Sequence, residues 1–138
     1  MSITVDWDDN EKSVIRCEFD AIWTWNDVFA MNRTIEALMD TVQHPVNVMI
    51  IMRGKNFPQS GTLTYTKHLF VHEHVNYGRQ VVFVGGTILI KTFERIIRKA
   101  YVKAMSTVHS EYVDTIESAR TLLAAHDTNS SFYEDIVQ

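Results

Sequence analysis

The sequence contains little that could cross-link the chain or anchor it in a membrane. Its one cysteine, Cys17, has no partner for an internal disulfide. The longest strongly apolar run, residues 48–52, is far shorter than the roughly 20 residues that a membrane-spanning helix needs. The first ten residues carry three acids and no basic side chain, which is wrong for a secretory signal. We therefore expect a cytoplasmic chain without a membrane span.

Composition favours one globular domain over a disordered or modular chain. Of the 138 residues, 46% are apolar and 22% are charged, which supplies enough apolar material for a core. Repeats, low-complexity segments and a Gly/Pro-rich linker are absent from the sequence. A net charge of −4 argues against a general nucleic-acid binder. We predict a single domain over residues 1–126 and a mobile tail over residues 127–138.

Alternation of apolar and polar residues near the amino end predicts a β-hairpin. The alternation covers residues 3–7 and again residues 15–19, with the turn-prone residues 8–10 between them. Two later segments, residues 46–52 and 81–84, are instead nearly continuous apolar runs rich in β-branched side chains. Such runs are typical of central strands that are covered on both faces.

Apolar residues at three- and four-residue steps predict four amphipathic helices. The patterns cover residues 28–42, 60–74, 89–104 and 115–126. Thr24 and Asp27 have the spacing of a capping box at the start of the first helix, and Pro45 ends it. We expect a last short strand over residues 108–113, before the fourth helix.

The predicted elements follow one another in the order β-β-α-β-α-β-α-β-α. This order indicates an α/β domain whose mixed five-stranded sheet joins an opening antiparallel hairpin to parallel central strands, with four helices. Four features carry a resemblance: the hairpin, the central apolar strands, the aromatic segment Ile22-Trp23-Thr24-Trp25-Asn26-Asp27, and the ending Tyr112-Val113-Asp114-Thr115-Ile116-Glu117-Ser118-Ala119. They resemble the STAS or SpoIIAA-like family of anti-sigma-factor antagonists and their relatives. The resemblance implies this fold and a non-enzymatic regulatory or protein-interaction role.

The resemblance also implies a regulatory loop after the third strand. In the regulatory members, an acidic residue in this loop precedes a serine that begins the next helix and accepts a phosphate. Ser60 lies at the matching place, although Arg53 stands where the pattern has an acid. Ser60 is therefore a candidate phospho-acceptor or anion site, and Arg53 and Lys55 would add positive charge beside it. The simpler interpretation is that Ser60 caps the helix.

Two groups of residues are candidates for an interaction surface. Trp23 and Trp25 precede the first helix, where exposed tryptophans would suit an interface and core packing is the simpler alternative. The third helix carries a basic stripe that could dock an acidic partner, a phosphate-bearing ligand or nucleic acid, or could be an ordinary solvated face. The stripe consists of Lys91, Arg95, Arg98, Lys99 and Lys103. We expect the partner to be another protein or a second copy of the chain.

Two histidines suggest a polar site. His68 and His72 would share one face of the predicted second helix, but they supply only half of a metal site. We predict no metal and no cofactor, and no local motif joins a nucleophile to a base, so binding ranks above catalysis. The alternative function is a small-molecule or anion binder, or an enzyme, with a pocket near the carboxyl ends of the central strands. Its polar residues would be Arg53, Lys55, His68 and His72.

Overall fold

The computed structural model describes residues 2–54, 58, 62–85 and 87–125. In chain order, its elements are β1 (Ile3–Trp7), β2 (Val14–Phe19), α1 (Trp25–Met39), β3 (Val46–Met52), α2 (Thr62–Tyr65), the 3-10 helix η1 (Thr66–Leu69), β4 (Tyr77–Val84), α3 (Thr87–Ala100), α4 (Val102–Met105) and β5 (His109–Val113). A last helix covers residues 116–125. Within these ranges, no helix combines the length and the apolar character needed to cross a membrane.

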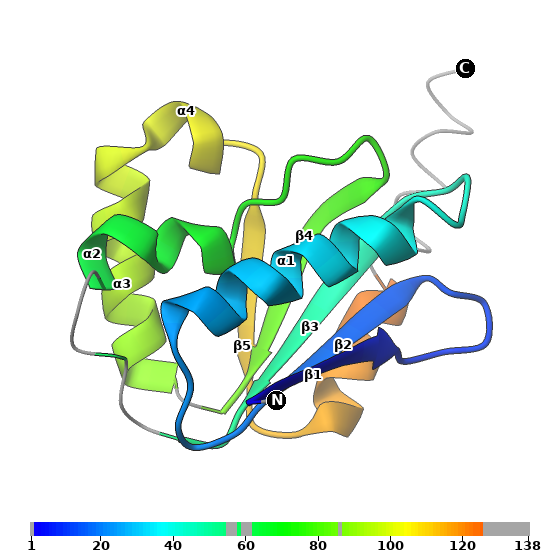
Figure 1. Cartoon of the computed structure of the whole chain (residues 1–138), viewed down its shortest axis with the longest axis horizontal. Coiled ribbons are helices and arrows are strands. Elements are labelled where there is room, and N and C mark those ends of the chain that lie inside the picture. Colours follow the sequence, from blue (N-terminus) through cyan, green and yellow to red (C-terminus); the bar gives the residue numbers. More distant parts are fainter. Residues whose placement is uncertain (1, 55–57, 59–61, 86, 126–138) are drawn as a thin grey trace.

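The five strands form one sheet in the order β1-β2-β3-β4-β5 (Figure 1). β1 and β2 pair antiparallel, and every later neighbour pairs parallel. Cys17 of β2 stands between Val5 of β1 and Ile50 of β3, so the hairpin continues directly into the parallel part of the sheet. The predicted fold class, an α/β domain with an opening hairpin, parallel central strands and four helical regions, is confirmed.

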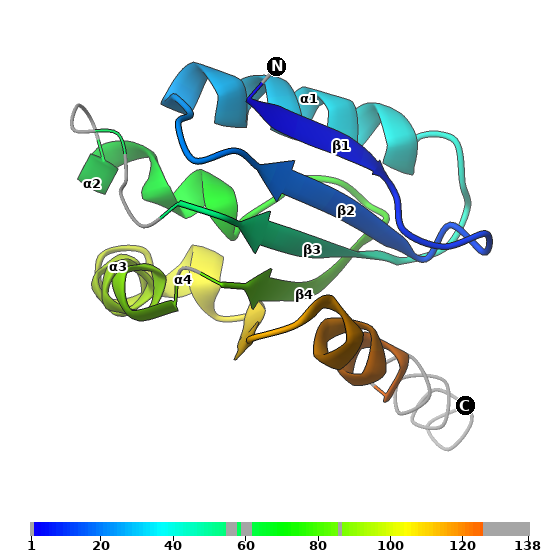
Figure 2. The same cartoon turned by 90° about the horizontal axis from the view of Figure 1, so that it is seen from below.

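The consecutive strand order decides which face each helix covers. A right-handed connection between parallel neighbours places its helix on the same face as long as the sheet grows in one direction. The connections after β2, β3 and β4 therefore put α1, α2 with η1, and α3 with α4 on one face. Among the described elements, the helix over residues 116–125 alone lies on the face opposite α1 (Figure 2).

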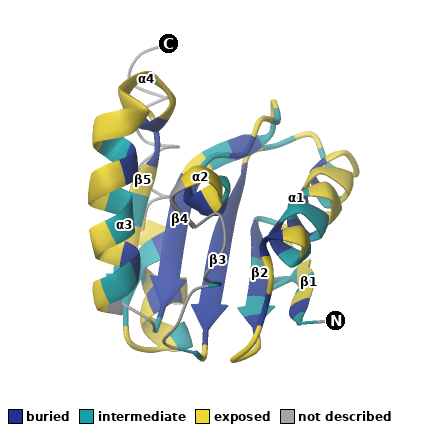
Figure 3. Cartoon of the chain, turned by 60° about the vertical axis from the view of Figure 1, so that its left-hand side comes forward, coloured by how far each residue is buried: buried dark blue, intermediate teal, exposed yellow. Residues whose placement is uncertain are grey.

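The central strands are buried on both sides, which explains their continuous apolar sequence. All residues of β3 are buried, as is the carboxyl half of β4 (Figure 3). Because side chains alternate along a strand, Val48 and Ile50 join the core beneath α1. Met49 and Ile51 join a second core on the opposite face, where they pack with Leu123 of the last helix.

The second helical region is shorter than predicted. α2 and η1 together end at Leu69, whereas the sequence pattern predicted helix as far as residue 74. The main-chain oxygen of His68 accepts a hydrogen bond from Asn32 Nδ2 (3.2 Å), and that of Phe70 accepts one from the Tyr77 hydroxyl (2.7 Å). A continuing helix would direct the amides of residues 72 and 74 at these oxygens. Contacts with α1 and β4 therefore take the place of the next helical turn.

The third helix is broken, and only part of its predicted apolar stripe is buried. Tyr101, with φ −127° and ψ 57°, separates α3 from the short α4. Ile97 is buried as predicted, together with Ile90, but Ile96 and Ala100 are exposed. The reason is the position of α3 beside β5, the last strand of the sheet, where the rest of the molecule covers only a narrow side of the helix (Figure 3).

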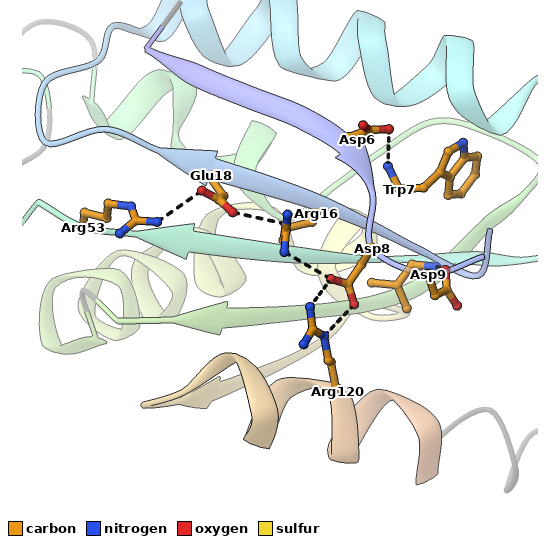
Figure 4. Close-up of polar contacts among 9 residues, drawn as sticks. Asp6, Trp7, Asp8, Asp9, Arg16, Glu18, Arg53 and Arg120 are labelled. Carbon is orange, nitrogen blue, oxygen red and sulfur yellow. Dashed lines mark hydrogen bonds and ion pairs between the residues drawn. The ribbon is translucent and has the colours of Figure 1, made fainter. Parts of the chain in front are cut away.

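A buried carboxylate ties the last helix to the hairpin. Arg120 donates from Nε (3.0 Å) and Nη2 (2.8 Å) to the two oxygens of Asp8, whose side chain is almost fully buried (Figure 4). Arg16 lies 3.6 Å from the same carboxylate, and Glu18 links Arg16 to Arg53 through contacts of 3.2 Å each. These side chains of alternating charge lie on the sheet face opposite α1, beyond the area that the last helix covers.

We expect Leu123→Ala to lower the free energy of unfolding by about 3 kcal/mol, because Leu123 is buried in the second core. Chemical denaturation followed by circular dichroism measures the change. Glu117→Ala, at an exposed position of the same helix, is the control and should change it by less than about 0.5 kcal/mol. Equal effects of the two substitutions would mean that this helix does not cover the sheet.

Candidate functional site

The structure describes one of the three residues predicted around a regulatory phosphate. Ser60 and Lys55 lie outside the described residues. Arg53 directly follows β3, and its Nη2 atom lies 3.2 Å from Glu18 Oε2. Arg53, at the carboxyl end of the strand, therefore shares the Glu18 carboxylate with Arg16.

The two tryptophans proposed for an interaction surface lie in the core. Trp23 is 6% exposed and Trp25 is 5% exposed. The two rings meet edge to face with 5.0 Å between their centres, and Trp23 makes a similar contact with Phe19. These rings close the core between the hairpin and α1, because a large apolar ring gains more from burial than from contact with water. The surface interpretation of Trp23 and Trp25 is wrong, and the core alternative is correct.

His68 and His72 do not share a helix face as predicted. His68 belongs to η1, whereas His72 lies in the irregular segment that leads to β4. The two side chains nevertheless line one groove of about 310 Å³, which we call the His72 groove. The His72 ring packs edge-on against Tyr77, the first residue of β4, with 5.1 Å between ring centres. This groove therefore lies at the amino end of β4, not at the carboxyl ends where a pocket for these histidines was expected.

The His72 groove has one wall from α1 and one from residues 67–73. Phe29, Asn32 and Glu36 lie at three- and four-residue steps, so they form one stripe along α1. Ala104 of α4 completes the lining. The chain leaves the helical path at Phe70, and residues 71–73, which have no regular secondary structure, line the groove together with this stripe.

Two buried polar atoms of the groove have no hydrogen-bond partner among the described residues. They are His72 Nε2 and Asn32 Oδ1. The Asn32 amide is held in place because its Nδ2 atom donates to the main-chain oxygen of His68. A buried polar atom without a partner costs about 1–3 kcal/mol of stability. Folded proteins contain few such atoms, and because Asn32 and His72 both line this groove we treat it as a candidate binding site.

Burial determines the charge of His72. The residue is 6% exposed, and loss of hydration lowers the pKa of His72 to about 4, with a smaller contribution from His68. The imidazole is therefore neutral at neutral pH and has one nitrogen that can accept a hydrogen bond. Within the described part of the chain, no group of three or more His, Cys, Asp or Glu side chains is placed to hold a metal.

A row of exposed residues follows the outer side of α3 and α4 (Figure 3). The row, which we call the α3–α4 face, consists of Ile88, Lys91, Arg95, Lys99, Val102 and Lys103, with Lys91 at its edge, where its Nζ atom lies 5.2 Å from the centre of the Tyr112 ring of β5. Steps of three and four residues align the members from α3 on one side of the helix. Ile88 is 82% exposed and Val102 is 67% exposed. Arg95, Lys99 and Lys103 form no ion pair with any residue that the structure describes.

Arg98, predicted as part of the basic surface, is mainly a structural residue. Its guanidinium donates to Glu94 Oε1 and to the main-chain oxygens of Met105 and Val108, each at 2.9 Å. These bonds satisfy carbonyl groups where α4 ends and β5 approaches. Arg98 therefore fixes the path of the chain, whereas its neighbours Arg95 and Lys99 face solvent.

Comparison of the chain with protein-family models, with curated proteins and with solved structures finds no match. The STAS or SpoIIAA-like resemblance therefore stays a prediction. The described residues build two candidate binding surfaces, the His72 groove and the α3–α4 face.

Sequence reasoning missed Asn32 and Glu36 of the groove. In the sequence they are ordinary polar residues beside the apolar stripe of α1. Their importance comes from the contact with residues 67–73, which are far away along the chain. The only signal in the sequence was their spacing from Phe29, which puts an aromatic ring on the polar side of the helix.

We expect Arg98→Ala to lower the free energy of unfolding by about 2 kcal/mol, because it removes hydrogen bonds from a charged donor to one carboxylate and two carbonyl groups. Urea denaturation measures the change. Arg95→Ala, the same substitution on the α3–α4 face, should stay within about 0.5 kcal/mol of the original protein. A larger loss from Arg95→Ala would refute the structural role of Arg98.

The pKa of His72 makes stability depend on pH. An unfolded histidine titrates near pH 6.5, whereas the folded one stays neutral down to about pH 4, so the unfolded state binds the extra proton between these values. Stability therefore falls as the pH falls through this window. Between pH 7 and pH 4, the His72 imidazole should lower the free energy of unfolding of the original protein by about 3 kcal/mol. We expect His72→Phe to abolish this loss. Urea unfolding at several pH values measures it, and a folded His72 ring that titrates near pH 6.5 by NMR would contradict it.

Proposed function

We propose that this chain is a non-enzymatic protein-interaction domain of the STAS or SpoIIAA-like type, and that its α3–α4 face binds an acidic surface of a partner protein. One observation carries the proposal: large apolar side chains, Ile88 and Val102, are exposed within a row of cations. A solvated helix face normally carries polar side chains at such positions. Interfaces combine apolar contacts with charged residues around them.

The distribution of charge supports an acidic partner. Residues 87–105 hold five of the 13 basic residues of the chain and one of its 17 acidic residues. That acid, Glu94, pairs with Arg98 and accepts a hydrogen bond from the Tyr112 hydroxyl, so it faces β5. The α3–α4 face is therefore positive, while the rest of the chain is negative. Such asymmetry orients a protein during its approach to an acidic surface.

Two observations favour binding over catalysis. Cys17, the one thiol, is completely buried, and burial raises the pKa of Cys17 far above its usual range, so the thiolate nucleophile does not form. The His72 groove contains two histidines, but its described lining has no serine, threonine or cysteine beside them. A nucleophile next to a base is what covalent catalysis requires.

Photo-cross-linking in the cell that makes this chain tests the proposal. A benzophenone amino acid in place of Val102 should form an adduct with a protein whose contacting surface is acidic. The same group in place of Val75, another exposed valine on the turn before β4, is the control and should not form that adduct. Equal adducts at both positions would contradict the proposal. An adduct with a second copy of the chain would identify the partner as the chain itself.

With the partner purified, we expect Arg95→Glu combined with Lys99→Glu to weaken binding roughly tenfold, because both side chains would then repel an acidic surface. The affinity of the original protein should also fall as salt rises. Isothermal titration calorimetry measures both effects. Lys12→Glu combined with Arg33→Glu reverses two exposed charges elsewhere and should change the affinity less than about twofold. Equal weakening by both pairs would mean that net charge, not this face, governs binding.

A further inference from the structure

We propose that the His72 groove binds a small primary amine, held as an ammonium ion. Three features indicate this class of ligand: buried acceptors without partners, carboxylates at the rim and an apolar wall. The groove uses different side chains from the α3–α4 face, so this inference is independent of the proposed function.

The buried acceptors come from both walls of the groove. Asn32 Oδ1 can only accept a hydrogen bond, and the amide is fixed because Nδ2 donates to the main-chain oxygen of His68 at 3.2 Å. His72 Nε2 accepts when the imidazole proton is on Nδ1. Neither atom has a partner among the described residues, and both are shielded from water. An ammonium group carries three N–H donors, which is enough to satisfy both atoms in the proposed complex.

Charge at the rim favours a cation. Glu36 and Glu73 line the groove from opposite walls, and both are exposed. Lys67 is the only lysine or arginine in the described lining, and its Nζ atom lies 4.6 Å from the centre of the Tyr101 ring, in a cation–π contact. Two carboxylates against one lysine leave the rim negative. This rim attracts an ammonium ion and repels a carboxylate or a phosphate.

The apolar wall and the volume limit the size of the ligand. Phe29 is held by edge-on contacts with Tyr65 (5.3 Å between ring centres) and His68 (5.1 Å), and Val71 and Ala104 extend its surface. A volume of about 310 Å³ is at the small end of the range for ligand sites. An amine with a short aromatic or aliphatic stem, about ten non-hydrogen atoms in all, fits this space.

NMR titration of the ¹⁵N-labelled protein with three probes of similar size tests the proposal. The probes are phenethylamine, which is a cation, 2-phenylethanol, which is neutral, and phenylacetate, which is an anion. We expect phenethylamine to shift the amide resonances of residues 29–36 and 67–73 and to bind roughly tenfold more tightly than 2-phenylethanol, while phenylacetate does not bind. Equal affinities for the three probes, shifts confined to other residues, or no binding of phenethylamine would overturn the proposal.

A variant of the buried acceptor separates a binding role from a structural one. His72→Phe removes Nε2 and keeps an aromatic ring, so we expect phenethylamine to bind roughly tenfold more weakly. The protein should unfold at the same or a higher urea concentration at pH 7.5, because the nitrogen that is removed had no partner. Unchanged phenethylamine affinity in this variant would overturn the proposal.

Variants of the rim test the preference for a cation. Glu36→Gln combined with Glu73→Gln should remove most of the advantage of phenethylamine over 2-phenylethanol. Glu11→Gln combined with Glu117→Gln removes the same charge from exposed positions outside the groove and should preserve that advantage. A preference lost equally in both pairs would mean that it follows net charge, and the proposal would fail.

Two further arms identify the source of the ammonium ion and keep the two proposals apart. Tighter binding of Nα-acetyl-lysinamide than of phenethylamine would assign the site to a lysine side chain of another protein, and the reverse order would assign it to a free amine. The chain with Arg95→Glu and Lys99→Glu should bind phenethylamine unchanged, because neither residue lines the groove. Failure of the α3–α4 face as a docking surface would therefore leave the amine site standing, and the converse also holds.

Discussion

β3 and the carboxyl half of β4 have no side that can meet water, and the rest of the fold follows from this constraint. Val48 and Ile50 need cover on one face of the sheet, and Met49 and Ile51 need it on the other. Right-handed connections between consecutive strands place three helical regions on the first face, so the cover for the second comes from residues 116–125. The crowded face also creates the two candidate surfaces. Its helices leave a groove between α1 and η1, and α3 at the margin keeps its outer side exposed.

Features that depend on near neighbours in the chain could be predicted from the sequence. The capping box is one of them: the Asp27 amide donates to Thr24 Oγ1 at 3.2 Å, and the Thr24 amide donates to Asp27 Oδ2 at 2.9 Å. The hairpin and the buried strands are others, because their spacing and apolar character already contain the required information. The error in the second helix has the opposite origin. Hydrogen bonds from Asn32 and Tyr77 interrupt it, and both come from other elements.

The candidate site was predictable only in part, for the same reason. The sequence paired His68 with His72 through a shared helix face, which is wrong because the helix ends before His72, and both line one groove only through the path of the folded chain. The basic stripe on α3 contains one arginine with a structural role, Arg98, and one that faces solvent, Arg95. Their spacing in the sequence does not distinguish these two roles. Arg98 reaches the main chain of Met105 and Val108, while Arg95 does not. Such a difference depends on where the chain returns after α4, and periodicity within one helix carries no information about that.

Neighbouring strands of this sheet are also consecutive in the chain, which bears on how the protein is made. As the polypeptide leaves the ribosome, each new strand can pair with the open edge left by the one before it, so the sheet can grow without waiting for distant segments. The apolar surface around Met49 and Val82 is different, since its cover is synthesised after all five strands. The interval between the emergence of β4 and that of the last helix is therefore the stage at which the nascent chain is most open to aggregation or to capture by a chaperone.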